Sequence, residues 1–337
     1  MKKFKIFICM LLVLLFACSK KEEVDDISIT KSIDESNEYI DKIVESPVID
    51  VKFSLGEETT YDNKVVEDKT TLKKLNKEHS VKYYAYVPVK NVKDYNFTYY
   101  DVQGNERKMK INENVSKNIY KWDSLEGVFS KKAPIGHKMS YGIDISKHQG
   151  DIDFNKVKNA GFDFVIIRIC YRGYGKKGNL LVDEMQDKYL MEAKKAGLKV
   201  GAYVFSQSKN VDEAVEEAKF AIKTLNGYKL DLPLFFDPET IKSDIARTDD
   251  VTGKEFTDNA IAFCEEVKKE GYIPGIYSNM VWEDYYFDME KLSDYKIWYA
   301  DYSNIPQTPY NFNFWQFSER GLVDGISGKV DLDVMIE

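Results

Sequence analysis

Two carboxylates two residues apart are the feature of this sequence on which catalytic chemistry would depend. Asp237 and Glu239 follow the apolar stretch 232–236, whose aromatic residues indicate a buried strand. Side chains alternate along a strand, so both acids are expected to point to the same side of the sheet. Crowded carboxyls push their pKa values apart, which leaves one protonated and one ionised, as glycosidic bond cleavage requires. The alternative interpretation is the start of a helix, where Asp-Pro and Glu are common.

Alternating strand-like and helical patterns indicate the elements that would position these acids. Helical patterns at 183–196, 211–225 and 257–270 separate the early strands, which is typical of a parallel α/β sheet. The gaps at 300–313 and 317–330 are too short for a strand–helix–strand crossover. We therefore predict an irregular TIM-like (β/α) barrel over 138–337, with eight strands, no helices in its last third, and an active site at the C-terminal ends of the strands. The predicted strands are 141–145, 164–169, 199–205, 232–236, 273–277, 296–300, 313–317 and 330–335.

Polar and aromatic residues recur at one end of nearly every predicted strand. Asp144 interrupts the first strand, and a buried charge there is costly unless it is paired or functional. A carbohydrate cleft is lined by such a mixture of rings and polar groups. The candidates on the other strands are Arg168, Tyr171, Tyr203, Tyr277, Trp298, Gln316 and Asp331.

The order of these motifs over about residues 140–335 resembles glycoside hydrolase family 25, a family of lysozymes (N-acetylmuramidases) with an eight-stranded β/α barrel. The resemblance rests on Gly-Ile-Asp-Ile-Ser at 142–146, Gly-Ala-Tyr-x-Phe at 201–205, Asp-x-Glu at 237–239, Ile-Tyr-Ser-Asn at 276–279, Trp-Gln-Phe-Ser at 315–318 and Val-Asp-Leu-Asp at 330–333. It implies cleavage of the β-1,4 bond between N-acetylmuramic acid and N-acetylglucosamine in peptidoglycan.

The resemblance also implies roles for single residues. Glu239 matches the general acid and Asp237 its companion carboxylate. Asp144 and Asp331 match two further acids, with Asp333 as the less favoured alternative to Asp331. Pro238 departs from the family, which usually has a bulky or β-branched residue there, and it fixes φ and removes an N–H. Positions that match the lining of the cleft are Tyr203, Tyr277, Trp298 and Gln316, with a looser match at Arg168 and Tyr171.

Two other functions stay open at this stage. One is a barrel hydrolase that cuts another N-acetylated glycan, such as chitin. The other is a non-catalytic relative that binds the cell wall and retains its acids as structure. Retention or inversion of configuration also stays open, because it depends on the separation of the acids and on participation of the substrate.

Composition restricts the partners. Apolar residues make up 43% and charged residues 31%, as in soluble globular proteins. A net charge of -8 argues against a nucleic-acid partner, which requires a basic face. Three scattered histidines lack metal-ligand spacing, so we expect no metal and no cofactor. Cys170 and Cys264 are expected to be small core residues without a disulfide.

The N-terminal third predicts export. Residues 1–17 combine a basic start with an apolar stretch too short to span a bilayer, and they precede Cys18 as in a bacterial lipobox. We expect a signal peptide, lipidation of Cys18, and a membrane-anchored lipoprotein at the cell envelope; the alternatives are an uncleaved anchor or an ordinary secretory signal. A tether with one short helix is expected at 18–50.

A small, mostly-β domain is expected at 51–131. It would include a hairpin of 95–99 and 109–111 around a turn at 103–105. This domain could bind the cell wall, pack on the barrel, or serve as a spacer, the role preferred in the absence of any other signal.

Overall fold

The computed structural model describes residues 96–100, 106–110, 115, 118, 120, 133–241, 245–302 and 306–337. The predicted signal peptide, the lipidation site Cys18, the tether, residues 51–95 of the predicted β domain and its predicted turn at 103–105 lie outside the described residues. Among the described residues, no helix combines the length and the apolar character needed to cross a bilayer.

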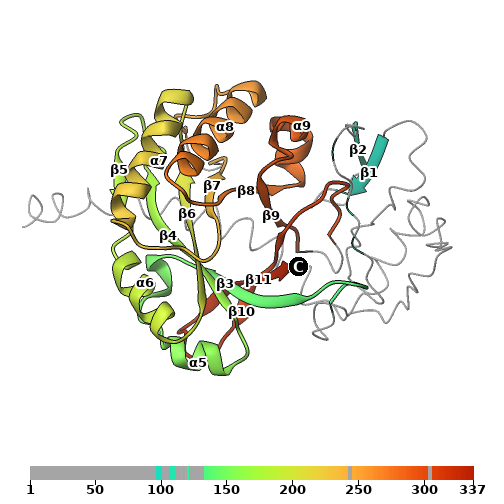
Figure 1. Cartoon of the computed structure of the whole chain (residues 1–337). Coiled ribbons are helices and arrows are strands. Elements are labelled where there is room, and N and C mark those ends of the chain that lie inside the picture. The colour runs from blue at the N-terminus through green and yellow to red at the C-terminus, as the bar shows by residue number, and fades with distance from the viewer. Residues whose placement is uncertain are drawn as a thin grey trace, which may run out of the picture.

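Eight strands close into a barrel, as the sequence predicts (Figure 1). The sheet runs in the order β3-β11-β10-β9-β8-β7-β6-β4, and pairing of β3 with β4 closes it. The short strand β5 (Leu180–Val182) pairs antiparallel with the C-terminal end of β4. The barrel strands are β3 (Met139–Ile145), β4 (Phe164–Arg172), β6 (Lys199–Ser206), β7 (Leu234–Pro238), β8 (Pro274–Asn279), β9 (Lys296–Ala300), β10 (Phe314–Leu322) and β11 (Lys329–Ile336).

The last barrel strand runs against the others. Pairing is parallel from β3 through β10, whereas β11 is antiparallel to both β10 and β3. The connection from Leu322 to Lys329 is too short for a crossover and forms a hairpin instead. As a result, Asp331 near the start of β11 lies opposite Asp144 near the end of β3.

Helices cover the part of the wall formed by the early strands, on the left of Figure 1. The predicted helices correspond to α6 (Gln186–Lys195), α7 (Val211–Leu225) and α8 (Gly253–Lys269). The last of these begins four residues earlier than predicted, because Thr252 and Glu255 form a capping box. The short elements not predicted are η2 (Lys147–Gln149), α5 (Phe154–Asn159), the π-helical turn η3 (Trp282–Tyr286) and α9 (Met289–Leu292).

An aromatic cluster fills the interior of the barrel beneath the acids. Glycines on the strands make room for it: a Cβ on Gly142 would come within 2.2 Å of the Phe164 ring, and one on Gly275 within 2.4 Å of the Phe235 ring. The cluster consists of Phe164, Ile166, Tyr203, Leu232, Phe235, Trp298, Phe314 and Met335, with Tyr277 packed against it. Cys170 and Cys264 are buried free thiols in the outer core, consistent with the predicted packing role.

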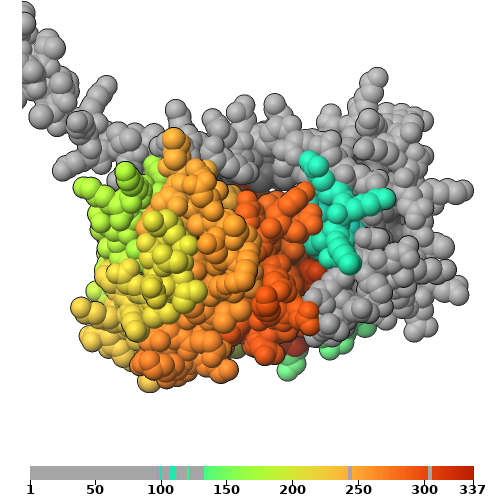
Figure 2. Space-filling model, turned by 90° about the horizontal axis from the view of Figure 1, so that it is seen from above, coloured from blue at the N-terminus to red at the C-terminus, as the bar shows by residue number. Residues whose placement is uncertain are grey.

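The predicted hairpin is present and packs on the barrel. Strands β1 (Asn96–Tyr100) and β2 (Glu106–Lys110) pair antiparallel, and Figure 2 shows them beside the orange-red surface of the later residues. The Tyr99 hydroxyl donates to Asp284 Oδ2 at 2.7 Å, and the Tyr120 hydroxyl donates to the carbonyl of Phe312 at 2.6 Å. These contacts favour packing on the barrel over the preferred role of spacer for the described part of this region.

Candidate active site

The four predicted acids gather at one end of the barrel. Asp144 comes from β3, Asp237 from β7 and Asp331 from β11, while Glu239 follows β7 directly. Asp237 and Asp144 are 4% and 6% exposed, whereas Glu239 and Asp331 are half-buried. The charge of Glu239 raises the pKa of each of the three aspartates, so the four side chains form one electrostatic cluster.

Asp237 and Glu239 lie at the end of a strand and not at the start of a helix. The strand continues through Pro238, and α8 begins only at Gly253, which excludes the alternative interpretation. Pro238 is tolerated because it is the last residue of the strand, where a missing N–H interrupts little of the ladder. Burial raises the pKa of Asp237 well above its ordinary value, Glu239 and Asp144 raise it further, and Arg168 lowers it.

The backbone of Glu239 is held by a side chain that the sequence did not single out. Gln207, just after β6, is 1% exposed and donates from Nε2 to the carbonyl oxygen of Glu239 at 2.6 Å. Its own Oε1 accepts from Thr248 Oγ1 at 3.1 Å. Because both ends of this amide are engaged, it fixes the residue that carries the predicted general acid.

Asp144 is held by Gln316, which was predicted to line the cleft. Gln316 is 4% exposed; its Nε2 donates to Asp144 Oδ2 at 2.8 Å, and its Oε1 accepts from the Tyr302 hydroxyl at 2.7 Å. Burial raises the pKa of Asp144 well above its ordinary value, and the neighbouring carboxyl of Asp333 adds to the rise. The hydrogen bond from Gln316 therefore fixes the orientation of the Asp144 carboxyl group.

Both acids of the Val-Asp-Leu-Asp motif belong to the cluster. Asp331 is the partner of Asp144 in the β3–β11 register, and burial followed by the charge of Asp144 raises its pKa well above the ordinary value. Asp333 is 0% exposed and accepts from the Trp298 indole nitrogen at 2.8 Å. Period-2 spacing of the two aspartates, visible in the sequence, places both on the inner face.

Arg168, whose charge acts on Asp237, is held by an ion pair with Asp183 and lies against the ring of Tyr171. Arg168 Nε lies 2.8 Å from Asp183 Oδ2, with side-chain exposures of 8% and 0%, and its guanidinium lies 5.0 Å from the centre of the Tyr171 ring. Asp183 also accepts from the backbone nitrogens of Lys147 and Met185 at 3.1 and 3.0 Å. Asp183 was not predicted, because nothing in its local sequence marks it as the partner of Arg168.

Three of the four predicted aromatic residues form the floor under the acids. The ring of Trp298 lies 5.9 Å from that of Tyr203 and 5.0 Å from that of Tyr277, centre to centre. Trp298 is 1% exposed and Tyr203 9%, while Tyr277 is half-buried. The structure therefore places Trp298 in core packing, and Tyr277 is the member with a surface that a ligand could reach.

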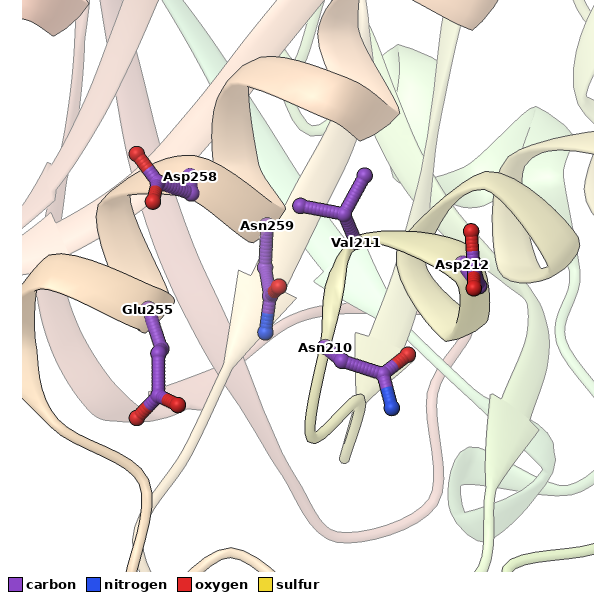
Figure 3. A pocket seen from close by; sticks show the side chains of 6 residues that line it. All are labelled: Asn210, Val211, Asp212, Glu255, Asp258 and Asn259. Atoms are coloured by element: carbon purple, nitrogen blue, oxygen red, sulfur yellow. The ribbon is translucent and has the colours of Figure 1, made fainter.

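A pocket lies away from this cluster, and no metal centre is found among the described residues. Within the described ranges, no group of three His, Cys, Asp or Glu side chains is arranged to hold a metal ion. A pocket of about 220 Å³ lies between the first turns of α7 and α8 (Figure 3). None of the predicted site residues lines it; the lining consists of Asn210, Val211, Asp212, Glu255, Asp258 and Asn259.

The C-terminal part of the chain is similar to known proteins. Residues 143–326 match the family model described as glycosyl hydrolases family 25. The autolytic lysozyme of Clostridium acetobutylicum is 28% identical over 200 residues, which cover 58% of this chain and 56% of that protein, so the match spans little more than half of the relative.

Two solved structures share the fold. The spore cortex lytic enzyme SleM of Clostridium perfringens is 26% identical with a TM-score of 0.51, over 58% of this chain and 67% of that one. The modular autolysin LytC of Streptococcus pneumoniae, solved with a synthetic peptidoglycan ligand, has a TM-score of 0.52 at 21% identity, over 72% of this chain and 57% of that one.

Proposed function

We propose that this chain, which belongs to glycoside hydrolase family 25, is a muramidase that cleaves the β-1,4 bond between N-acetylmuramic acid and N-acetylglucosamine in peptidoglycan. The observation that carries the proposal is the convergence of Asp144, Asp237, Glu239 and Asp331 at one end of the barrel. Glycosidic cleavage usually uses a pair of carboxyl groups, one protonated as the acid and one ionised. Similarity to an autolytic lysozyme and to an autolysin solved with a synthetic peptidoglycan ligand supports the choice of substrate.

In the proposed mechanism, Glu239 donates a proton to the glycosidic oxygen. Burial and mutual repulsion keep a proton on the Asp237–Glu239 pair, and Glu239 is the more exposed member, so it is the one that meets the substrate. When the proton resides on Glu239, the positive charge of Arg168 favours the ionised form of Asp237. The Asp237 carboxylate then orients the N-acetyl group or stabilises positive charge at the anomeric carbon.

Asp144 and Asp331 complete the site in this proposal. Their raised pKa values reduce the negative charge around Glu239, and the bond from Gln316 sets the orientation of Asp144. Tyr277, the half-buried member of the aromatic floor, supplies a ring face on which a sugar can stack.

Replacement of Glu239 tests the proposal. We expect Glu239→Gln to lower the rate of lysis of purified peptidoglycan by about 10²–10⁴-fold, the usual contribution of a general acid, with an unchanged thermal melting curve. Glu270→Gln, an exposed position at the end of α8, is the matched control and should retain wild-type activity.

Analysis of the products separates this function from its alternatives. New muramic acid reducing ends are expected from wild-type protein. Release of N-acetylglucosamine oligomers from chitin with no action on peptidoglycan would show that chitin, not peptidoglycan, is the substrate. Binding of peptidoglycan without cleavage would refute the proposed hydrolase activity.

We also propose that the chain is exported and anchored to the membrane through lipid on Cys18, a proposal supported by the N-terminal sequence alone. Full-length protein should fractionate with membranes, whereas Cys18→Ser should not incorporate labelled fatty acid. Labelling of the Cys18→Ser variant at the wild-type level would contradict the assignment of that residue.

A further inference from the structure

The carboxyl of Asp144 is held in place through a tyrosine that the proposed mechanism does not use. Gln316 donates to Asp144 Oδ2 at 2.8 Å, and its own Oε1 accepts from the hydroxyl of Tyr302 at 2.7 Å. Tyr302 follows the end of β9, in the chain that leads to β10. We refer to the described residues 301–302 and 306–313 as the β9–β10 connection. The orientation of Asp144 therefore depends on where this connection holds the Tyr302 hydroxyl.

Asp301 ties the two described parts of the connection to each other and to β10. Its backbone N–H donates to the carbonyl of Gln316 at 3.1 Å, and its own carbonyl accepts from the Trp315 indole nitrogen at 2.6 Å. Its carboxylate oxygen Oδ2 accepts from the backbone N–H of Gln307 at 2.7 Å. A movement of Gln307 is therefore passed on to Asp301, and from there to the next residue in the chain.

Two N-terminal residues hold the later part of the connection through its backbone carbonyls. The backbone N–H of Asn118 donates to the carbonyl of Pro309 at 2.9 Å, and its side-chain Nδ2 donates to that of Thr308 at 3.2 Å. The hydroxyl of the buried Tyr120 donates to the carbonyl of Phe312 at 2.6 Å, and the two rings lie 4.9 Å apart, edge to face. We call Asn118 and Tyr120 the docked segment. Three backbone carbonyls of the connection thus find their donors in the docked segment.

A second anchor holds the same part of the connection from the side of the barrel. The buried Thr308 donates from Oγ1 to Glu283 Oε2 in η3 at 2.6 Å, and it accepts from the backbone N–H of Tyr310 at 3.0 Å. This anchor does not involve the docked segment. Removal of one bond from the docked segment should therefore loosen the connection without releasing it.

We propose that the docked segment positions the active site: it holds the β9–β10 connection so that the Tyr302 hydroxyl stays on Gln316 and Gln316 stays on Asp144. Tyr302 is the positioning residue next to the acids, and Tyr120 acts on it from the docked segment. The N-terminal region then contributes to the chemistry of the barrel and does more than pack on it. The kinetic part of this inference rests on the proposed hydrolase function, whereas the coupling through the connection does not.

Removal of two tyrosine hydroxyls tests the kinetic part. Tyr302→Phe leaves a buried acceptor without its donor, so kcat on soluble peptidoglycan fragments should fall by about tenfold with little change in KM. Tyr120→Phe should lower kcat by about two- to fivefold, since the remaining bonds still hold the connection. Tyr228→Phe is the matched control, because its hydroxyl also donates to a backbone carbonyl, that of Leu190 at 2.9 Å. It should retain wild-type kcat, with every variant shown by its melting curve to be folded at the assay temperature.

A double variant tests the route between the two tyrosines. If Tyr120 acts through Tyr302, the variant with both Tyr120→Phe and Tyr302→Phe should have the same kcat as Tyr302→Phe alone, because the bond on which Tyr120 acts is already lost. Two effects that multiply would show that the tyrosines act independently and would overturn the inference. A wild-type kcat in Tyr302→Phe would also overturn it.

Amide hydrogen exchange measures the coupling without reference to activity. In Tyr120→Phe the amides of Gln307 and Asp301 should exchange about two- to fivefold faster than in the wild type, whereas Tyr228→Phe should leave both at their wild-type rates. The amide of Ala202, a buried residue of β6, is the internal reference and should not change.

Unchanged exchange of both amides in Tyr120→Phe would overturn the inference, and this comparison decides alone if Tyr302→Phe does not fold. Faster exchange in a chain that has no hydrolase activity would support the coupling and would refute the proposed function instead.

Discussion

Replacement of Arg168 by methionine would separate the stabilising role of its ion pair from its effect on the acids. In Arg168→Met, Asp183 keeps the backbone donors Lys147 N and Met185 N at 3.1 and 3.0 Å but loses the guanidinium at 2.8 Å. Removal of one partner from a buried pair costs about 3–5 kcal/mol. Because two donors remain, we expect a loss near the lower end, about 3 kcal/mol in the free energy of unfolding.

The same variant should change the pH dependence of activity. Arg168 lowers the pKa of Asp237, so its removal raises that pKa further. A carboxyl with a higher pKa stays protonated to a higher pH. The acidic limb of kcat/KM, where Asp237 must ionise, should therefore move to higher pH in Arg168→Met.

A double variant distinguishes the two effects. Arg168→Met combined with Asp183→Asn removes the uncompensated charge, and we expect it to recover about half or more of the lost stability. The acidic limb should stay shifted, because the cation is still absent. Urea denaturation and pH–rate profiles on peptidoglycan measure both quantities. Lys158→Met, which breaks the exposed pair of Lys158 with Asp163, is the control and should cost about 0–1 kcal/mol.

Two outcomes would refute this reasoning. A wild-type pH profile in the double variant would show that the charge of Arg168 does not act on Asp237. An Arg168→Met protein as stable as the wild type would show that Asp183 does not depend on its partner.

Two further predictions concern the face on which the hairpin packs. Tyr99→Phe should lower the free energy of unfolding by about 1.5 kcal/mol, because a buried hydroxyl loses its bond to a half-buried carboxylate; a chemical denaturation curve that matches the wild type would contradict this. Burial raises the pKa of Glu283 from 4.5 to about 8, so its contribution is intact below pH 4.5 and is lost as the pH rises towards 8. Relative to Glu283→Gln, the wild type should lose up to about 1.4 kcal/mol per pH unit between pH 5 and 8, and parallel stability curves for the two proteins would be inconsistent with a buried neutral Glu283.

The positions of the strands were predictable because each is a local apolar run bounded by turn or helix signals. The eight strands of the barrel overlap the eight predicted ones, and α7 has its predicted bounds. Chain length predicted the loss of helices after β9, since short connections cannot hold them. The antiparallel direction of β11 was not predicted, although the short connection between β10 and β11 permits only a hairpin.

The acids of the site could also be identified from the sequence, because a charged residue at the end of a buried strand is costly unless it is paired or functional. The residues that hold these acids in place could not be identified in this way. Gln316 and Asp144 are 172 residues apart, and Trp298 and Asp333 are 35 apart, so no local pattern pairs them. The roles of Asp183 and Gln207 likewise depend on contacts with Arg168 and Glu239 that only the folded chain brings about.

The sequence by itself therefore determined which residue types could do chemistry and at which end of the barrel they would meet, because periodicity and chain length are local properties. Only the tertiary structure decided which side chains are ionised, which stand at the surface, and which serve as buried supports. Burial and the distances between charges control those properties, and both arise only when distant strands close into one barrel.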